Sequence, residues 1–575
     1  MKNMLSFFKS YKKAIIGVIL LLFLQTLGTL FIPTLTASII NNGIVNGDIP
    51  YILRTGGKML ILAALTGLFA IFGTYLSAIL SSGVGRDIRN AIFTKAQNFS
   101  ITDFNTIGTA SMITRSTSDV TQIQQATLMS LQMLLPAPIM AIGGLVLAFF
   151  KNKTMGIIIL ITMIVFMFTA FILGKKAVPL FGKLQRGMDK INRVMREYIT
   201  GARVIRAFNR TEAEQNRVNQ SFDDYAGIAI KVNKIFAVMM PLVMLMLNLC
   251  TLCILWFGGI RVSQGSMAIG DIMAVIEYSF LILYYLIMGV MVFMMLPKAQ
   301  ACGIRISEVL NLHPTISDHT SFSVPDKNAP KLSFDAVTFA YPDAEEPVLS
   351  RLTFSCNPGE ITAIIGGTGS GKSTIASLIP RFYDIQEGKI CIDGIDISTY
   401  SQKKLREQIG FVPQKAFLFS GTIRDNLRFG NPHATDEILY KASQIAQADD
   451  FITELELGFD APVAQGGNNF SGGQKQRLSI ARALVKKPEI YVFDDSFSAL
   501  DFKTDARLRA ALKSEITDAA VILVAQRISS IMDANQIIVL DNGMIAGIGT
   551  HHTLLKNCTV YKEIAESQLS KEELQ

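Results

Sequence analysis

"ITAIIGGTGSGKST", residues 361–374, places a glycine-rich turn between a β-branched run and a run that favours a helix. The turn has the spacing Gly366-x-x-x-x-Gly371-Lys372-Ser373, which marks a phosphate-binding loop when a strand precedes it and a helix follows it. Glycines let backbone N–H groups curl around phosphates, the lysine reaches the β- and γ-phosphates, and the helix dipole favours the anion. We therefore predict an α/β P-loop nucleotide-binding domain that uses ATP and Mg²⁺.

The residues predicted to hold the nucleotide at this loop are contiguous: Gly366, Gly367, Thr368, Gly369, Ser370, Gly371, Lys372, Ser373 and Thr374. The Ser373 hydroxyl is predicted to bind Mg²⁺. A second magnesium ligand is predicted at Asp494, which ends the apolar strand "IYVFD". A carboxylate at that place can hold the ion, often through water. Apolar strands that end in aspartate are common, so the prediction at Asp494 depends on the phosphate loop earlier in the chain.

The first half of the chain has the composition of a membrane protein. Half of the 575 residues are hydrophobic and only 17% are charged. Runs of about 20 residues with few or no charges predict membrane-spanning helices. We expect six, at residues 14–32, 59–80, 133–150, 154–174, 235–260 and about 272–297. The six cysteines show no spacing that suggests a disulfide framework or a zinc site.

Lysine and arginine gather before the first predicted span and in the long connections after spans two and four. This distribution predicts that the N-terminus, both long connections and the C-terminal half are cytosolic. The net charge of +8 follows the same distribution, so we expect no nucleic-acid partner. The long connections have apolar residues at helical spacing, as in "GKLQRGMDKINRVMREYITGARVIRAF". We predict membrane helices that continue into the cytosol and turn at short crossing segments; the alternative is a disordered basic loop.

The expected fold is a membrane α-helical domain, with six transmembrane helices and long cytosolic extensions, fused to the P-loop nucleotide-binding domain. The predicted boundaries are residues 1–310 for the transmembrane domain, 311–330 for a linker and 331–575 for the nucleotide-binding domain. Near residue 331 the composition changes to short β-like runs, glycine turns and charged helices.

A third motif identifies a family. "NNFSGGQKQRLSIARAL" holds Ser471, Gly472, Gly473 and Gln474 at the predicted start of a helix, where small residues and the helix N-terminus suit a γ-phosphate. With this motif the sequence resembles the ATP-binding-cassette (ABC) transporter family over all 575 residues. Six spans followed by one cassette resemble an exporter-type half-transporter.

The resemblance implies roles for further residues. Tyr341 in "FAYPD" matches the aromatic residue that stacks on adenine, although a core tyrosine at a strand end is an alternative. Gln414 in "GFVPQ" matches a glutamine that touches magnesium and senses the membrane domain, and Asp501 in "SALD" matches an aspartate that crosses between two cassettes. Residues 104–120 and 201–210 match the segments that couple the two domains. The family is dimeric, and each nucleotide lies between one phosphate loop and the SGGQ helix of the other cassette.

Two positions depart from the pattern of a fast ATP site. Family members with such a site carry glutamate after the magnesium aspartate and histidine after the next strand; this chain has Asp495 and Gln526 there. Both residues belong to the site built on this chain's own phosphate loop, whereas the SGGQ motif is intact. The sequence thus resembles the degenerate-site subunit of bacterial heterodimeric multidrug ABC exporters. The expected partner is a second half-transporter with an intact cassette; the alternative is a homodimer with two slow sites.

The cargo is the least determined feature of the sequence. Methionine-rich fifth and sixth spans favour a hydrophobic or amphipathic small molecule, with lipid-facing or core methionines as the alternative. Glu277 in the sixth span is a candidate contact for a cationic cargo or a proton, and a carboxylate in interfacial water is the alternative. The expected location of a half-transporter of this kind is the bacterial plasma membrane. A translocator of lipids or lipid-linked precursors and an importer built on the same frame are the alternatives.

Overall fold

The computed structural model of the chain describes residues 2–318, 326, 328–342 and 344–569. The chain folds into two compact units. One contains the chain up to Gln97 and the segment Ile107–Leu312; the other contains Asn98–Thr106 and the chain from His313 onwards. Part of the expected linker, residues 319–325 and 327, lies outside the described residues.

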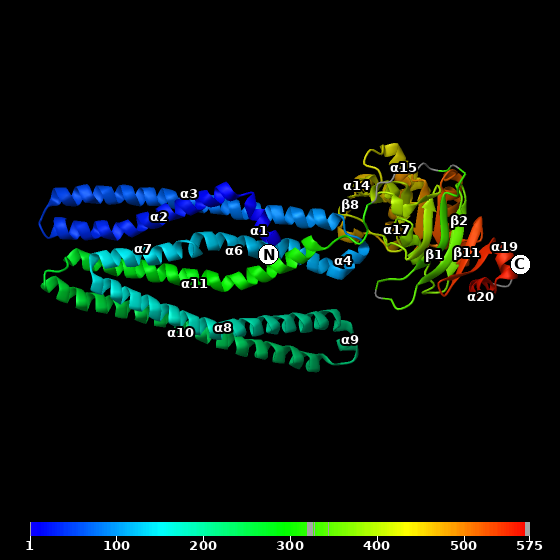
Figure 1. Ribbon diagram of the computed structural model, residues 1–575. Helices are drawn as coiled ribbons and strands as arrows, with labels where there is room; N and C mark the ends of the chain where they lie inside the picture. The colour runs from blue at the N-terminus through cyan, green and yellow to red at the C-terminus, as the bar shows by residue number, and fades with distance from the viewer. Residues whose placement is uncertain (1, 319–325, 327, 343, 570–575) are drawn as a thin grey trace. The chain divides into compact units, whose positions relative to one another are not determined.

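The first unit is a bundle of long helices (Figure 1). Among the described residues, six helical stretches are long and apolar enough to span a membrane, which confirms the six predicted spans. The helices are α1 (Lys2–Lys9), α2 (Lys12–Ser38), α3 (Ile49–Gln97), α5 (Thr109–Thr114), α6 (Val120–Met129), α7 (Pro136–Lys151), α8 (Lys153–Thr200), α9 (Ala202–Ala207), α10 (Thr211–Ser263) and α11 (Ile269–Asn311). Helix α4 (Ile101–Ile107), which follows α3 in the chain, belongs almost wholly to the second unit. Short π-helical turns interrupt the helices of the first unit at η1 (Ile39–Ile44), η2 (Arg115–Asp119) and η3 (Ser130–Leu134).

Helices α2 and α3 form one hairpin and α8 and α10 form another, while α11 lies against α7 and α2 (Figure 1). As the sequence predicted, the charged connections are helical: α3 and α8 run far beyond their apolar parts before the chain turns. The second turn is made by α9 within the predicted segment 201–210. Many large apolar side chains on these helices are exposed, such as Phe168 and Trp256. Lipid would cover such side chains in a membrane.

The first crossing segment begins earlier in the chain than predicted. The family resemblance placed this segment at residues 104–120. In the structure the short crossing helix is α4, and most of residues 104–120 belong to the long helical stretch that follows it. The Ser100 hydroxyl accepts from the Asp103 backbone N–H at 3.1 Å, and the Asp103 carboxylate accepts from the Ser100 N–H at 2.9 Å. This reciprocal pair is a capping box, which fixes the start of a helix.

Three sheets and several helices form the second unit. One sheet has the strand order β2-β1-β4-β5, the largest has the order β12-β11-β3-β10-β9-β6, and a small third sheet pairs β7 with β8. The strands are β1 (Leu332–Phe339), β2 (Leu349–Cys356), β3 (Ile361–Gly366), β4 (Glu387–Ile392), β5 (Ile395–Asp396), β6 (Ile409–Val412), β7 (Gly421–Thr422), β8 (Pro462–Val463), β9 (Ile490–Asp494), β10 (Ala520–Val524), β11 (Gln536–Asp541) and β12 (Met544–Gly549). Strands β11, β3, β10, β9 and β6 are parallel.

Helices cover the larger sheet, and apolar side chains fill the space between the layers. The helices are α12 (Lys372–Leu378), α13 (Gln402–Glu407), α14 (Ile423–Arg428), α15 (Asp436–Ile445), α16 (Asp449–Glu454), α17 (Gly472–Lys486), α18 (Phe502–Glu515), α19 (His551–Asn557) and α20 (Thr559–Gln568). In the parallel register Val524 pairs with both Asp494 and Ile364. The carboxyl ends of β3, β9 and β10 therefore meet at one edge, where ligands of open parallel sheets bind.

Candidate nucleotide and cargo sites

The phosphate loop connects β3 to α12 at this edge, as predicted. Its glycines are needed for two reasons. Gly369 and Gly371 have φ angles of +85° and +97°, which side chains other than glycine rarely adopt. Gly366 has ordinary φ, but a Cβ there would collide with the Leu540 carbonyl oxygen of β11.

Lys372 folds over the loop. Its Nζ donates to the carbonyl oxygens of Gly366 at 2.8 Å and Gly367 at 2.7 Å. The Ser370 hydroxyl is buried and has no hydrogen-bond partner among the described residues. Buried polar atoms are rarely left without a partner, so the loop fits a ligand that supplies oxygen atoms, as phosphate does.

Ser373 and Asp494 meet where a magnesium ion is expected. The Ser373 Oγ donates to Asp494 Oδ1 at 2.8 Å. Asp494 is only 7% exposed, and this burial raises the pKa of its carboxyl, while the Ser373 hydrogen bond acts in the opposite direction. Burial lowers the pKa of the Lys372 ammonium, against the attraction of the Asp495 and Asp494 carboxylates.

Asp495 has two amide donors on a single oxygen atom. Gln414 Nε2 donates to Asp495 Oδ2 at 3.0 Å, and Gln526 Nε2 donates to the same atom at 2.7 Å. Asp495 is 6% exposed, and its backbone is left-handed, with φ of +48°. The structure thus brings Asp495, Gln526 and Gln414 together. The sequence predicted Gln414 as a magnesium ligand only, and its contact with Asp495 was not predicted.

Tyr341 lies close to the phosphate loop. Its hydroxyl is 3.1 Å from Thr374 Oγ1, and its ring meets those of Phe339 and Tyr383 edge-on, with centroids 5.0 and 5.3 Å apart. The ring is half-buried, so part of it remains open to a ligand. This position is compatible with adenine stacking and also with the alternative of a tyrosine that only packs at a strand end.

The SGGQ turn and Asp501 have local partners of their own. Ser471 caps α17 by accepting from the Gln474 N–H at 3.3 Å, and the Gln474 Oε1 accepts from the Ser471 N–H at 2.9 Å. Asp501 caps α18 by accepting from the Thr504 N–H at 2.9 Å. Within the described residues, no hydrogen bond or ion pair links the SGGQ turn to the phosphate loop.

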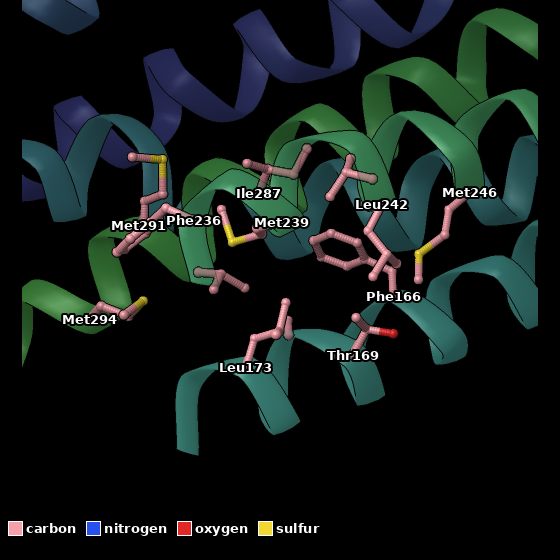
Figure 2. A pocket seen from close by; sticks show the side chains of 13 residues that line it. Phe166, Thr169, Leu173, Phe236, Met239, Leu242, Met246, Ile287, Met291 and Met294 are labelled. Atoms are coloured by element: carbon pink, nitrogen blue, oxygen red, sulfur yellow. The ribbon is translucent and has the colours of Figure 1, made fainter. Parts of the chain in front are cut away.

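A methionine-rich feature of the membrane unit is a narrow seam between α8, α10 and α11. Figure 2 shows that Phe166 and Leu173 lie there with Met239, Leu242 and Met291. The cavity has a volume of about 40 Å³. Small-molecule pockets start at about 300 Å³, so one chain in this conformation does not enclose a cargo at the seam.

The comparisons with known proteins agree with this architecture. The family model described as the ABC transporter transmembrane region matches residues 15–302, and that described as ABC transporter matches residues 349–498. The uncharacterized ABC transporter ATP-binding protein Rv1273c of Mycobacterium tuberculosis is 39% identical over 564 residues, 97% of each chain. The corresponding protein YfiB of Bacillus subtilis is 37% identical over 574 residues, 100% of this chain and 99% of that protein. A bacterial Atm1-family ABC exporter with ATP bound has a TM-score of 0.81 at 26% identity, covering 97% of this chain and 99% of that one.

Six spans followed by a P-loop domain with an SGGQ turn define a membrane transporter that uses ATP. The chain belongs to the ABC transporter family and is an exporter-type half-transporter, as the resemblance predicted. It is embedded in a membrane, binds and hydrolyses ATP, works as a dimer and carries a substrate across the bilayer.

Proposed function

We propose that this chain is the slow-site half of a heterodimeric exporter of amphipathic compounds. The observation that supports this most strongly is the pair of amide donors on Asp495 Oδ2. A general base must lie within hydrogen-bond reach of the attacking water. Aspartate is one methylene shorter than glutamate, and here one of its oxygens is already bound by Gln414 and Gln526. A displacement of about 1 Å can cost on the order of a hundredfold in rate.

Gln526 adds a second reason for slow turnover. A glutamine amide donates hydrogen bonds but cannot carry the positive charge of an imidazolium beside a γ-phosphate. Asp495 and Gln526 both belong to the site on this chain's phosphate loop, whereas Ser471 and Gln474 keep their reciprocal cap. The partner should therefore be a different half-transporter, with glutamate and histidine at the matching positions. Its fast site would use the SGGQ turn of this chain.

Magnesium fits the donor set proposed for it. Ser373, Gln414 and Asp494 offer hydroxyl, amide and carboxylate oxygens, which hard cations prefer, and phosphates and water would complete the shell. No cluster of three or more histidine, cysteine or acidic side chains suited to a metal occurs in the described residues, so a softer ion has no obvious site. The adenine would lie on Tyr341, and Asp501 would face the partner cassette.

The orientation and the cargo follow from the membrane unit. The lysine-rich and arginine-rich extensions support a cytosolic nucleotide-binding domain, and the bilayer in this proposal is the bacterial plasma membrane. The flexible thioethers along α10 and α11, such as Met239 and Met291 (Figure 2), suit apolar cargo of varied shape. The alternative, a translocator of lipids or lipid-linked precursors, would use the same ATP-driven mechanism.

The first experiment is a native mass measurement of the chain, tagged at its C-terminus and purified from its source cells in mild detergent. We expect a one-to-one complex with a second half-transporter that carries the glutamate and the histidine. A homodimer would contradict the asymmetric proposal. With the pair in hand, ATPase stimulation by amphipathic cations and neutral compounds supports the exporter, whereas stimulation by lipids alone supports the translocator.

A further inference from the structure

A second cavity of the membrane unit differs from the seam in its lining. It has a volume of about 200 Å³ and lies between α2, α3, α11 and the π-helical turn η3. Its polar lining residues are Gln25, Thr74, Gln132, Tyr284 and Tyr285; the others are leucine and methionine. We name it the glutamine pocket. Hydrogen-bonding side chains from four separate segments of the chain thus converge in a part of the protein that is otherwise apolar.

The polar side chains of the glutamine pocket have no hydrogen-bond partners in the part of the chain that the structure describes. Gln25 Oε1 is buried without a partner, and none of the five polar side chains makes a hydrogen bond within the described residues. Neighbouring polar groups behave differently: the Thr26 and Ser77 hydroxyls each donate to the backbone carbonyl four residues earlier, at 2.7 Å. Unsatisfied polar groups are costly in a membrane and usually mark a functional site.

The backbone at the pocket is irregular. In η3, which contains Gln132, the Leu135 N–H donates to the Ser130 carbonyl five residues earlier, at 3.0 Å. Such π-helical turns are less regular than α-helix and occur often at functional sites. Gln132 is about 28 Å along the helix from Lys151 at its far end, by the rise of about 1.5 Å per residue. Since the hydrocarbon core is about 30 Å thick, the pocket lies toward the side proposed to be cytosolic.

The lining residues of the glutamine pocket favour the binding of an uncharged group. A carboxamide offers one acceptor and two donor hydrogens, and a phenol offers both roles. No lining residue carries a charge, and Glu277, seven residues before Tyr284 on α11, is about 10 Å away along the helix axis. The rings of Tyr284 and Tyr285 meet edge-on with centroids 5.6 Å apart and provide apolar contact area. A charged group entering here would lose its hydration without gaining a counter-charge.

We propose that the glutamine pocket is a cargo subsite for a neutral polar group that both donates and accepts hydrogen bonds, such as a carboxamide or a hydroxyl. The inference rests on the proposed export of amphipathic compounds and specifies their polar part. The cavity is smaller than a site for a whole drug-sized molecule, so it takes the polar end while the apolar remainder lies outside. Tyr284, one of the lining residues, is 55% exposed, so the chain does not fully cover the cavity.

The test compares two fluorescent probes on the purified full-length complex in lipid nanodiscs without nucleotide. Both are dansyl compounds with the same linker; one ends in a primary carboxamide and the other in a trimethylammonium. Gln25→Leu and Gln132→Leu should each weaken binding of the carboxamide probe about tenfold and that of the ammonium probe less than about twofold. Both variants replace an amide that makes no hydrogen bond within the described residues by an apolar group, so the fold should be kept.

Thr29→Val is the matched control, because the Thr29 hydroxyl on the same helix is already bonded to the Gln25 carbonyl at 3.0 Å and is no part of the pocket. It should leave both affinities unchanged. Carboxamide binding that does not respond to Gln25→Leu or Gln132→Leu would overturn the subsite and leave a water-filled cavity, without touching the export proposal. If neither probe binds and neither is exported by the wild-type pair, the proposed cargo class itself fails.

Discussion

At the scale of single residues, the edge of the larger sheet holds two carboxylates with different surroundings. Asp494 faces the Ser373 hydroxyl, whereas Asp495 faces the amides of Gln414 and Gln526. The left-handed backbone at position 495 suits aspartate, whose short side chain tolerates that region better than most. Slow turnover in this proposal therefore comes from side-chain reach and from the donors, and both can be changed by substitution.

The double variant Asp495→Glu, Gln526→His should accelerate the site on this chain. Glutamate extends the carboxylate toward the water, and histidine supplies the missing charge. In a complex whose partner has its own catalytic glutamate changed to glutamine, we expect the residual ATPase rate to rise by about tenfold to a hundredfold. The measurement is steady-state phosphate release from the purified pair. An unchanged rate would mean that these two residues do not limit turnover.

Magnesium-dependent ATP binding should weaken on acidification sooner than an ordinary aspartate predicts. Burial raises the pKa of Asp494 above its usual 3.8, so the carboxyl takes up a proton and loses the ion as pH falls through the raised pKa. For the nucleotide-free protein, the raised pKa of Asp494 makes acidification favour the folded state. The protonated form is favoured in the folded state, so this stabilisation is complete below 3.8 and is lost as pH rises through the raised pKa.

Calorimetric titrations with ATP, at several pH values and with either Mg²⁺ or EDTA, separate this effect from protonation of the nucleotide. The affinity gained from Mg²⁺ should shrink with falling pH in the wild type. In Asp494→Asn it should be small at every pH. The prediction fails if the Mg²⁺ and EDTA series decline in parallel.

Motifs predicted the position of these residues but not their contacts. Lys372, Ser373 and Asp494 lie where the spacing of the loop and the strand placed them. The hydrogen bond between Gln414 and Asp495 joins residues 81 positions apart. Neither side-chain conformation is specified by a local pattern, because it depends on how β6 and β9 are paired.

At the scale of secondary-structure elements, helix ends and helix contacts hold the parts in place. Apolar periodicity predicted the long helices, since it is repeated over many turns. The family resemblance predicted a crossing segment at residues 104–120, whereas the short helix α4 begins earlier, at the capping pair of Ser100 and Asp103. Asp103 also accepts from the Thr315 N–H at 3.2 Å, a long-range contact that no sequence pattern announces.

Helix α11 is joined to η2 by an ion pair with unequal burial. Arg305 donates to both carboxylate oxygens of Asp119, at 2.8 and 2.6 Å, and the side chains are 44% and 4% exposed. Arg305→Met should lower the unfolding free energy by about 2 kcal/mol, because a buried carboxylate is left without its partner. Thermal unfolding in detergent would show this as a lower midpoint.

The control is Lys190→Met, which breaks an ion pair with Asp224 whose two side chains are both about half exposed. Exposed pairs contribute less than about 1 kcal/mol, so the midpoint should hardly move. Equal shifts of the midpoint for Arg305→Met and Lys190→Met would show that burial of Asp119 does not increase the contribution of its ion pair to stability.

At the scale of the whole molecule, composition alone separated the membrane and nucleotide-binding halves, because hydropathy is averaged over hundreds of residues. The same averaging concealed the glutamine pocket. Gln25 and Gln132 are uncharged, so they do not interrupt an apolar run, and they come together only through the packing of α2 and η3 against each other and against α11. A sequence pattern reports where helices are, whereas a pocket requires knowing which faces meet.

The asymmetric dimer predicts that two substitutions in this one chain reduce the ATPase rate by very different amounts. Gly472 begins α17, and a Cβ atom added there meets no atom within 4 Å, so Gly472→Asp should leave the fold intact. It places a negative charge where the partner's γ-phosphate is proposed to bind, and we expect the ATPase rate of the pair to fall on the order of a hundredfold. Lys372→Ala disables only the slow site and should reduce the rate less than about twofold, because the fast site lies on the partner's phosphate loop.

Both variants are compared in phosphate release by the purified pair, after native mass measurement shows that the dimer is intact. A reversed order would assign fast hydrolysis to the site of Asp495, and equal losses would indicate two equivalent sites.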